Sequence, residues 1–370
     1  LIGDDFSTCS KRSVTGSGKK AVFTGGISYA YAKEYLQDYP EVKLCKISTP
    51  YPFPEKFVLS CLEGVDEVIC LEELSPFIEA EVTKLIGKHR LNIKVYGKES
   101  GYVKTSGENS ADYVAKVLSD FLKIPSQEAG IYLGDMPDLP VRPPVLCAGC
   151  PHRASFYAVK KAMEGKNAYF CGDIGCYTLG NAMPLDMVDT CLCMGAGITM
   201  AQGFHWVDKE GTCFAFVGDS TFFASGMTGI VNAVYNEADM ILCVLDNSTT
   251  AMTGHQPHPG TGKNMMGDIV DKISIEHILE GMGVKKIVTV NPLDLNKSVE
   301  VIKDCASLPG VKAIIFKSPC IALFKPEKKL CISDKCIQCK KCIREIGCPA
   351  ISTVKGKVTI NEDLCTGCGL

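Results

Sequence analysis

Two stretches of the sequence decide the fold, Thr212-Cys-Phe-Ala-Phe-Val-Gly-Asp-Ser220 and Met240-Ile-Leu-Cys-Val-Leu-Asp-Asn247. Each is a short apolar run of the kind that forms a buried strand, and each ends in polar residues. The carboxyl ends of neighbouring parallel strands meet at one edge of a sheet, where α/β proteins bind their ligands. The two stretches therefore predict a parallel α/β domain whose ligand site contains Gly218, Asp219, Ser220 and Asn247.

The polar residues at these strand ends suit a magnesium ion bound to a diphosphate. Asp219 and Asn247 offer the oxygen ligands that Mg²⁺ takes beside phosphate oxygens. Gly-Asp-Ser or Asp-Asn alone is typical of a turn, but the two together, each after an apolar run, favour a thiamine diphosphate motif. In the loop that follows, Thr249 is a candidate metal ligand through its backbone carbonyl, and Met252 is a candidate wall of the cofactor or substrate pocket.

The second strong signal is a run of cysteines near the end of the chain. It reads Cys336-x2-Cys339-x2-Cys342-x5-Cys348-Pro349 and continues with Cys365-x2-Cys368. Three closely spaced cysteines and a fourth before proline are typical of bacterial ferredoxins. A zinc ribbon needs two Cys-x-x-Cys pairs but has no use for the third cysteine or the Cys-Pro. We therefore predict two [4Fe-4S] clusters, one on Cys336, Cys339 and Cys342 and one on Cys348, Cys365 and Cys368.

Cysteine is also the outlier of the composition, with 21 residues against one tryptophan in a chain of 370. A long chain with no signal peptide argues against a secreted disulfide framework, so we expect a reducing, cytoplasmic location. The net charge of −3 gives no reason to expect nucleic acid or an anionic membrane as a partner. No apolar run reaches the roughly 18 residues that a membrane helix needs.

Strands and helices alternate through most of the chain, which predicts parallel α/β domains. A polar Ser/Gly-rich start, a proline-rich crossing and a final cysteine-rich segment interrupt this alternation. The predicted divisions are a linker at 1–18, an α/β domain at 19–135, a linker at 136–144, a second α/β domain at 145–325, and the cysteine segment at 326–370.

Several motifs occur together in one order: Cys147-Ala-Gly-Cys150-Pro-His152-Arg153, Gly172-Asp-Ile-Gly-Cys-Tyr177, Cys193-Met-Gly-Ala-Gly197, the Gly218 and Asn247 pair, and the ferredoxin-type tail. With them the chain resembles the alpha subunits of the indolepyruvate:ferredoxin oxidoreductase family, within the 2-oxoacid:ferredoxin oxidoreductase superfamily. The resemblance covers essentially the whole chain. The x5 spacing before Cys348 is similar to what that family tolerates at its first cluster.

This resemblance implies a fold for each division of the chain. Residues 19–135 look like a transketolase C-terminal-like domain, and residues 145–325 like the doubly wound, pyrophosphate-type thiamine diphosphate-binding domain. Residues 326–370 look like a small ferredoxin-like α+β domain. We expect a fragment, because the upstream pyrimidine-binding domain and the last cysteine of the second ferredoxin motif are missing. Such a fragment is not expected to turn over alone.

The resemblance also implies an activity and its partners. The activity is the oxidative decarboxylation of an arylpyruvate such as indolepyruvate, with thiamine diphosphate and Mg²⁺ as cofactors. Coenzyme A takes the acyl group, iron–sulfur clusters carry the electrons, and ferredoxin accepts them. A smaller beta subunit is the expected partner. A short 2-oxoacid as substrate, a non-redox thiamine-dependent decarboxylase and a pure electron-transfer module are the alternatives, and the cysteine tail argues against the decarboxylase.

Cys147, Cys150 and Cys176 match positions that hold a further cluster in pyruvate-type relatives. A fourth cysteine is expected after the thiamine motif, but the segment up to residue 310 holds only Cys305, on a predicted helix. We therefore expect two clusters rather than three. Cys150, Gly175 and Cys176 are instead expected to shape the loop at the phosphate end of the cofactor.

Histidines and lysines offer further candidates. His152 and His255 are candidate catalytic residues near the thiazolium or the substrate carboxylate, and His258 lies in the same loop as His255. Packing or solvated histidines are the alternative. The stretch Lys325–Lys341, with six lysines, is a candidate docking patch for an acidic ferredoxin. Five cysteines in apolar runs are expected to be buried: Cys171, Cys191, Cys193, Cys213 and Cys243.

Overall fold

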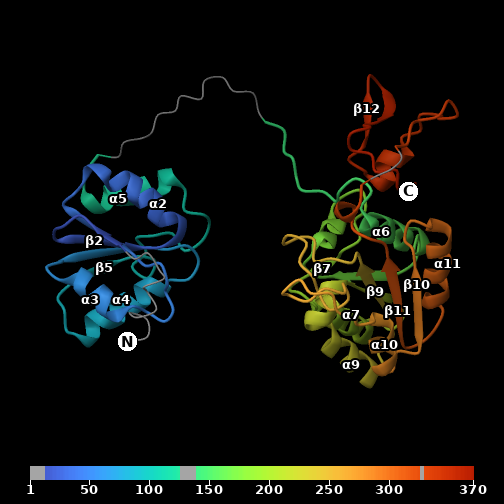
Figure 1. Ribbon diagram of the computed structural model, residues 1–370, viewed down its shortest axis with the longest axis horizontal. Coiled ribbons are helices and arrows are strands. Elements are labelled where there is room, and N and C mark those ends of the chain that lie inside the picture. Colours follow the sequence, from blue (N-terminus) through green and yellow to red (C-terminus); the bar gives the residue numbers. More distant parts are fainter. Residues whose placement is uncertain (1–12, 126–138, 326–328) are drawn as a thin grey trace. The chain divides into compact units, whose positions relative to one another are not determined.

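A computed structural model describes residues 13–125, 139–325 and 329–370 (Figure 1). Contacts divide the chain into two compact units, Leu1–Leu139 and Pro140–Leu370. The division falls within the linker predicted at 136–144. Within the described ranges, no helix is both long and apolar enough to span a lipid bilayer.

The first unit is a five-stranded sheet with helices on both faces. Its strands are β1 (Ser13–Thr15), β2 (Lys20–Thr24), β3 (Val42–Lys46), β4 (Glu67–Leu71) and β5 (Lys94–Tyr96), in the spatial order β1-β3-β2-β4-β5. Only β1 runs antiparallel, beside β3. The helices are α2 (Gly26–Tyr35), α3 (Glu55–Leu62), α4 (Phe77–Lys88) and α5 (Ala111–Leu122), with the short turn η2 (Leu36–Asp38). Residues 13–15 thus form an edge strand where the sequence predicts a linker, and residues 1–12 lie outside the described range.

Alternation along β2 explains the two layers of helices. Val22 packs with α2 and α5 on one face, whereas its neighbour Phe23 packs with α3 and α4 on the other. Successive side chains of a strand point to opposite faces, so a fully apolar strand needs cover on both sides. Figure 1 shows α2 and α5 on one side of this sheet and α3 and α4 on the other.

The second unit contains a six-stranded, all-parallel sheet in the order β10-β11-β9-β8-β6-β7. Its strands are β6 (Ala168–Gly172), β7 (Thr190–Cys191), β8 (Thr212–Gly218), β9 (Met240–Asp246), β10 (Lys286–Val290) and β11 (Val311–Lys317). Its helices are α6 (Pro151–Ala162), α7 (Ala196–Val207), α8 (Asp219–Thr221), α9 (Met227–Tyr235), α10 (Ile275–Gly281) and α11 (Leu295–Ala306). Short helical turns are η3 (Cys176–Asn181), η4 (Phe222–Gly226), η5 (Ile321–Leu323) and η6 (Cys342–Ile346).

The central strands β8 and β9 are buried on both faces, as their apolar sequences predict. Phe214 and Phe216 pack into the core beneath α6 and α11, while Ala215 and Val217 pack toward α7, α9 and α10. Because β8 and β9 are hydrogen-bonded neighbours, their carboxyl ends lie side by side. The fold therefore brings the two deciding stretches of sequence to one edge of the sheet.

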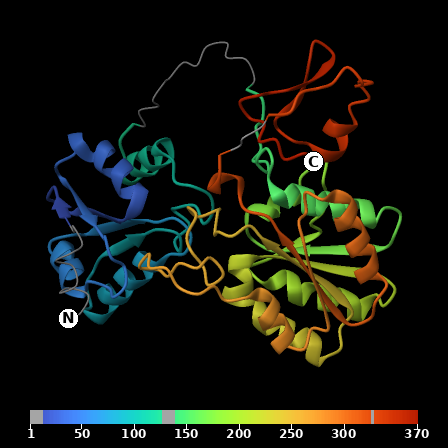
Figure 2. The same cartoon turned by 45° about the vertical axis from the view of Figure 1, so that its right-hand side comes forward.

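The C-terminal segment packs on this second unit through α6 (Figures 1 and 2). Its described residues are 329–370, and its regular elements are η6 and the antiparallel pair β12 (Ile351–Val354) and β13 (Lys357–Ile360). The five residues between Cys342 and Cys348 include most of η6, and Gly347 caps this turn in a left-handed conformation, with φ of 62°. A side chain at Gly347 would collide with Pro184, so the glycine allows the segment to dock.

The five cysteines predicted as core residues divide into two groups. Cys171, Cys213 and Cys243 are buried. The prediction is wrong for Cys191 and Cys193, which are exposed. Cys191 ends a two-residue strand at the edge of the sheet and Cys193 lies in the loop before α7, so neither is covered on both sides.

Candidate functional site

A cavity of about 590 Å³ lies at the carboxyl edge of β6, β8 and β9. The loops that leave these three strands form most of its wall, and the first turn of α6 and Met194, in the loop after β7, supply the rest. The position is that predicted from the two strand ends.

Asp219 is the most firmly held side chain of this cavity. It is 3% exposed and directly follows β8. Its Oδ1 accepts a hydrogen bond from the N–H of Ser220 and its Oδ2 one from the N–H of Ser248, both at 2.8 Å. His258 Nε2 lies 3.1 Å from Oδ2 but is buried without a well-formed hydrogen bond. Asp219 thus joins the loop after β8 to the loop after β9.

Asn247 and His152 meet at the inner end of the cavity. The two side chains are buried, and Asn247 Nδ2 lies 3.2 Å from His152 Nε2. Burial lowers the pKa of His152 to about 4, against a smaller opposing effect of Asp219. The imidazole is therefore neutral near pH 7 and accepts the hydrogen bond of the amide. This pairing orients Asn247 Oδ1, which accepts from the N–H of Thr249 at 3.2 Å.

Asp173 and Tyr177 form a buried pair on the other side of the cavity. The Tyr177 hydroxyl donates to Asp173 Oδ1, and the N–H of Gly195 donates to Oδ2. Burial raises the pKa of Asp173 to about 6, and the two hydrogen bonds oppose that rise. A Cβ at Gly218 would lie 2.7 Å from the Tyr177 ring, so glycine is needed here to seat the tyrosine.

Two buried carboxylates, Asp219 and Asp246, lie at this edge of the sheet, and Asp219 lines the cavity. Asp246 and Asp219 neighbour each other, and burial followed by the charge of Asp219 raises the pKa of Asp246, while Lys317 opposes it. A cation at Asp219 would offset this repulsion. The donors predicted for Mg²⁺, one carboxylate, one amide and one backbone carbonyl, fit that role.

The structure brings most of the predicted site residues together. His152 and eight others line the cavity: Gly175, Cys176, Gly218, Asp219, Ser220, Asn247, Thr249 and Met252. Cys150 is buried but does not line it, and His255 is exposed on the loop beyond. Of the two loop histidines, His258 is the one that faces Asp219.

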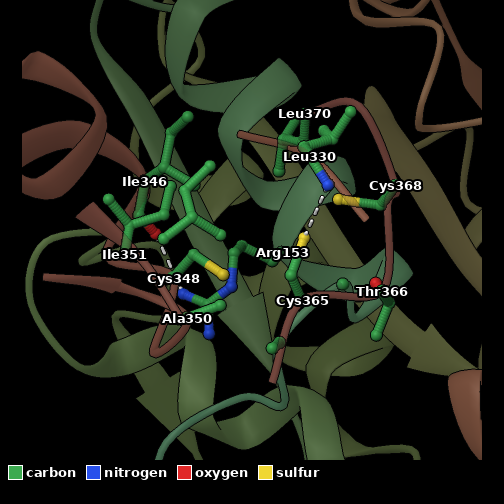
Figure 3. Close-up of a pocket in the computed structure, with 13 residues that line it drawn as sticks. Arg153, Leu330, Ile346, Cys348, Ala350, Ile351, Cys365, Thr366, Cys368 and Leu370 are labelled. Carbon is green, nitrogen blue, oxygen red and sulfur yellow. Dashed lines mark hydrogen bonds between the residues drawn. The ribbon is translucent and has the colours of Figure 1, made fainter. Parts of the chain in front are cut away.

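A second cavity gathers three of the predicted cluster ligands (Figure 3). We call it the thiol cavity, because Cys348, Cys365 and Cys368 line it, and its volume is about 530 Å³. Across the part of the chain that the structure describes, no three His, Cys, Asp or Glu side chains are grouped for a single metal ion. In a four-iron cluster each thiolate binds a different iron, so three thiols around one cavity are the relevant arrangement. The hydroxyl of Thr366 is buried in this wall without a partner among the described residues.

A further cysteine, Cys320, lies near the first cavity, which we call the cofactor cavity after the ligand predicted for it. Cys320 follows β11, beyond the stretch up to residue 310 that offers only Cys305, and its N–H donates to the carbonyl of Asn247 at 2.9 Å. Burial, then the thiols of Cys147 and Cys320, raise the pKa of Cys176. Cys320 therefore lies near Cys176. It is a candidate for the fourth ligand of a further cluster, which the sequence prediction lacked.

Sequence reasoning also missed the roles of Asp173 and Tyr177. Asp173 is the first residue after β6, so a third strand end at the same edge was the signal that could have identified it. Tyr177 carries no such signal, because its contact with Gly218 depends on the way the loop after β6 folds back.

Comparisons with known proteins agree with this geometry. The family model described as thiamine pyrophosphate enzyme, C-terminal TPP binding domain, matches residues 173–316. That range begins directly after β6 and contains the ends of β8 and β9.

Relatives match over nearly the whole chain. The indolepyruvate oxidoreductase subunit IorA of Archaeoglobus fulgidus is 38% identical over 369 residues, which cover 96% of this chain and 58% of the relative. The subunit of the same name from Methanothermobacter thermautotrophicus is 38% identical over 358 residues, which cover 94% of this chain and 57% of the relative. The subunit from Thermococcus kodakarensis is 35% identical over 404 aligned positions, which cover 100% of this chain and 61% of the relative. The chain thus spans about three fifths of the length of these relatives.

Proposed function

The chain belongs to the family of the indolepyruvate oxidoreductase subunits IorA, and on that premise we propose that it carries the thiamine diphosphate site and two electron-carrying clusters of an indolepyruvate:ferredoxin oxidoreductase. The reaction converts an arylpyruvate, coenzyme A and oxidised ferredoxin into an acyl-coenzyme A, CO₂ and reduced ferredoxin. A smaller beta subunit is the proposed partner. The cytoplasmic location expected from the cysteine content stays a prediction.

One observation carries this proposal: consecutive residues of α6 line the two cavities. His152 lines the cofactor cavity and Arg153 lines the thiol cavity. A non-redox decarboxylase has no use for a thiol cavity one residue away from its cofactor. An oxidoreductase needs that closeness, because electrons must leave the cofactor for the clusters.

The residues of the cofactor cavity have distinct tasks in this proposal. Thiamine diphosphate supplies, when bound, the carbon nucleophile and the electron sink for decarboxylation. Asp219, Asn247 and the carbonyl of Thr249 hold the Mg²⁺ of its diphosphate, with Asp219 kept in place by two backbone N–H groups. His152, neutral and buried, fixes the Asn247 amide. Met252 is half exposed at the cavity wall, where an aromatic substrate side chain can pack against it.

An anaerobic substrate comparison tests the proposal. The purified enzyme with its partner subunit is given indolepyruvate, pyruvate or 2-oxoglutarate, each with coenzyme A, and reduction of a viologen dye is followed. We expect reduction to be fastest with indolepyruvate and to require coenzyme A for the acyl product. Preference for pyruvate would refute the arylpyruvate assignment and keep the reaction class, and no reduction with any 2-oxoacid would refute both.

Iron analysis tests the number of clusters. Two four-iron clusters give about eight irons per chain, and a further cluster at Cys147, Cys150 and Cys176 gives about twelve. The variant Cys320→Ala decides whether Cys320 completes such a cluster. If there are two clusters, the variant keeps about eight irons per chain. If Cys320 holds a third cluster, the iron content falls from about twelve to about eight. Cys191→Ala, an exposed cysteine outside both cavities, is the matched control and should change nothing.

A further inference from the structure

A buried arginine ties the C-terminal segment to α6. Arg153 is 4% exposed and lies in the first turn of the helix. Its Nη1 donates to the carbonyls of Ile346 and Gly347, both at 2.9 Å, and its Nη2 donates to the carbonyl of Leu146. These bonds hold the turn that precedes Cys348 against the helix that carries His152.

The charge of this arginine has no anionic partner in the described parts of the chain. All its hydrogen-bond acceptors are neutral carbonyls, and its buried Nε has none there. A guanidinium stays protonated in proteins, although burial lowers the pKa of Arg153 and the neighbouring thiols, Cys348 first, oppose that fall. An unpaired buried charge is costly, which indicates that an anion belongs beside it.

The thiol cavity is where that anion would sit. In Figure 3 the Arg153 guanidinium lies beside Cys348, and Cys365 and Cys368 line the opposite side of the same cavity. A four-iron cluster held by thiolates carries a net negative charge, and one-electron reduction makes it more negative. A fixed positive charge at the cavity wall favours the reduced form.

We propose that Arg153 is a positioning residue for electron transfer: it compensates the charge of a cluster on Cys348, Cys365 and Cys368, raises the reduction potential of that cluster, and fixes its loop next to the helix turn that lines the cofactor cavity. This inference rests on the proposed function in one respect, namely that the three cysteines hold a cluster. The cysteine pattern alone does not indicate this role of Arg153.

A redox titration followed by electron paramagnetic resonance tests the charge. The purified enzyme is reduced stepwise with dithionite, without substrate. For Arg153→Met we expect the ratio of reduced to oxidised cluster at a fixed potential to fall about tenfold, or about 59 mV for one electron, at one cluster only. Arg153→Lys keeps a positive charge and should keep a potential close to that of the wild type.

Tyr157→Phe separates the charge from the docking. The Tyr157 hydroxyl donates to Glu345 in η6 at 2.6 Å, so this neutral change weakens the same junction and leaves Arg153 in place. We expect faster hydrogen exchange at residues 342–348 in this variant, with both potentials unchanged. A shift as large as that of Arg153→Met would mean that docking alone sets the potential, and would overturn the proposal.

The remaining outcomes also decide the question. Unchanged potentials in Arg153→Met would overturn it, as would loss of iron from both Arg153 variants. The proposal would be supported if Arg153→Met lost its iron while Arg153→Lys kept its iron and the wild-type reduction potential. A wild-type enzyme without iron would overturn the cluster assignment as well, whereas failure to oxidise any 2-oxoacid would leave the titration result standing.

Discussion

At the scale of residues, the cofactor cavity is built from buried polar side chains that restrain one another. Asp219 is fixed by the N–H groups of Ser220 and Ser248, and Asn247 by His152. Such restraint matters because a ligand that already points in the right direction loses little entropy when it binds a metal. Burial also lowers the pKa of His152 to about 4.

Asp173 provides the clearest consequence of burial for stability. Its pKa is raised in the folded state to about 6, so the protonated form is favoured by folding. Its contribution to stability is complete below about pH 4 and is lost as the pH rises through about 6, on the order of 3 kcal/mol in all. Asp173→Asn keeps the shape, with an amide that can accept from Gly195 and donate to Tyr177.

We therefore predict that the difference in unfolding free energy between wild type and Asp173→Asn shifts in favour of the variant between pH 4 and pH 7. Urea unfolding at a series of pH values measures this difference. A difference that does not depend on pH would mean that Asp173 is not buried as described.

His258 is predicted to orient the metal carboxylate. Its Nε2 lies 3.1 Å from Asp219 Oδ2, and the ring is buried. Removal of such a supporting group typically weakens metal binding about 10–100-fold. We expect His258→Ala to raise by that factor the Mg²⁺ concentration needed for thiamine diphosphate binding, measured by calorimetry. His277→Ala, an exposed histidine of α10, is the control, and equal Mg²⁺ requirements in the two variants would refute the role of His258.

At the scale of elements, the strands β8 and β9 decide where the cavity lies. Phe216 is fully buried, with its ring centroid 4.7 Å from that of Phe156 in α6. Truncation of a buried phenylalanine to alanine costs about 3–5 kcal/mol. We predict this loss for Phe216→Ala in chemical denaturation, and a change within about 0.5 kcal/mol for Val207→Ala, which is 89% exposed. A loss below 1 kcal/mol at Phe216 would contradict the described core.

Local patterns predicted most of the elements and missed those that depend on partners. The apolar stretches that begin at Thr212 and Met240 form β8 and β9, as predicted. The edge strand β1 was missed because its polar residues acquire strand structure only by pairing with β3.

The candidate site divides in the same way. Asp219 and Asn247 were predictable, because strand ends in a parallel sheet meet at one edge. The sequence predicted Cys150 and His255 at the site, but neither lines the cavity. Residues outside helices and strands have no periodicity that fixes the direction of their side chains. The role of Arg153 could not be assigned from sequence, since two of its three carbonyl acceptors, Ile346 and Gly347, lie nearly 200 positions away.

At the scale of the whole molecule, the chain contains two compact units with separate cores. Leu85 is fully buried in the core of the first unit. Leu85→Ala should cost about 2–5 kcal/mol and lower only one of two calorimetric transitions. Thiamine diphosphate with Mg²⁺ should raise the other transition. A single transition that moves as a whole would contradict independent units.

The central claim is that the strand ends of β8 and β9 hold thiamine diphosphate through Mg²⁺. Isothermal titration calorimetry of the purified enzyme with thiamine diphosphate and Mg²⁺ tests it most directly. The comparison is between wild type, Asp219→Ala and, as a control carboxylate in an exposed ion pair with Lys286, Asp304→Asn. We predict Mg²⁺-dependent, saturable binding to wild type and Asp304→Asn, and binding at least about 100-fold weaker, or about 2.7 kcal/mol, in Asp219→Ala. Equal affinities in all three proteins, or no binding to the wild type, would contradict the account.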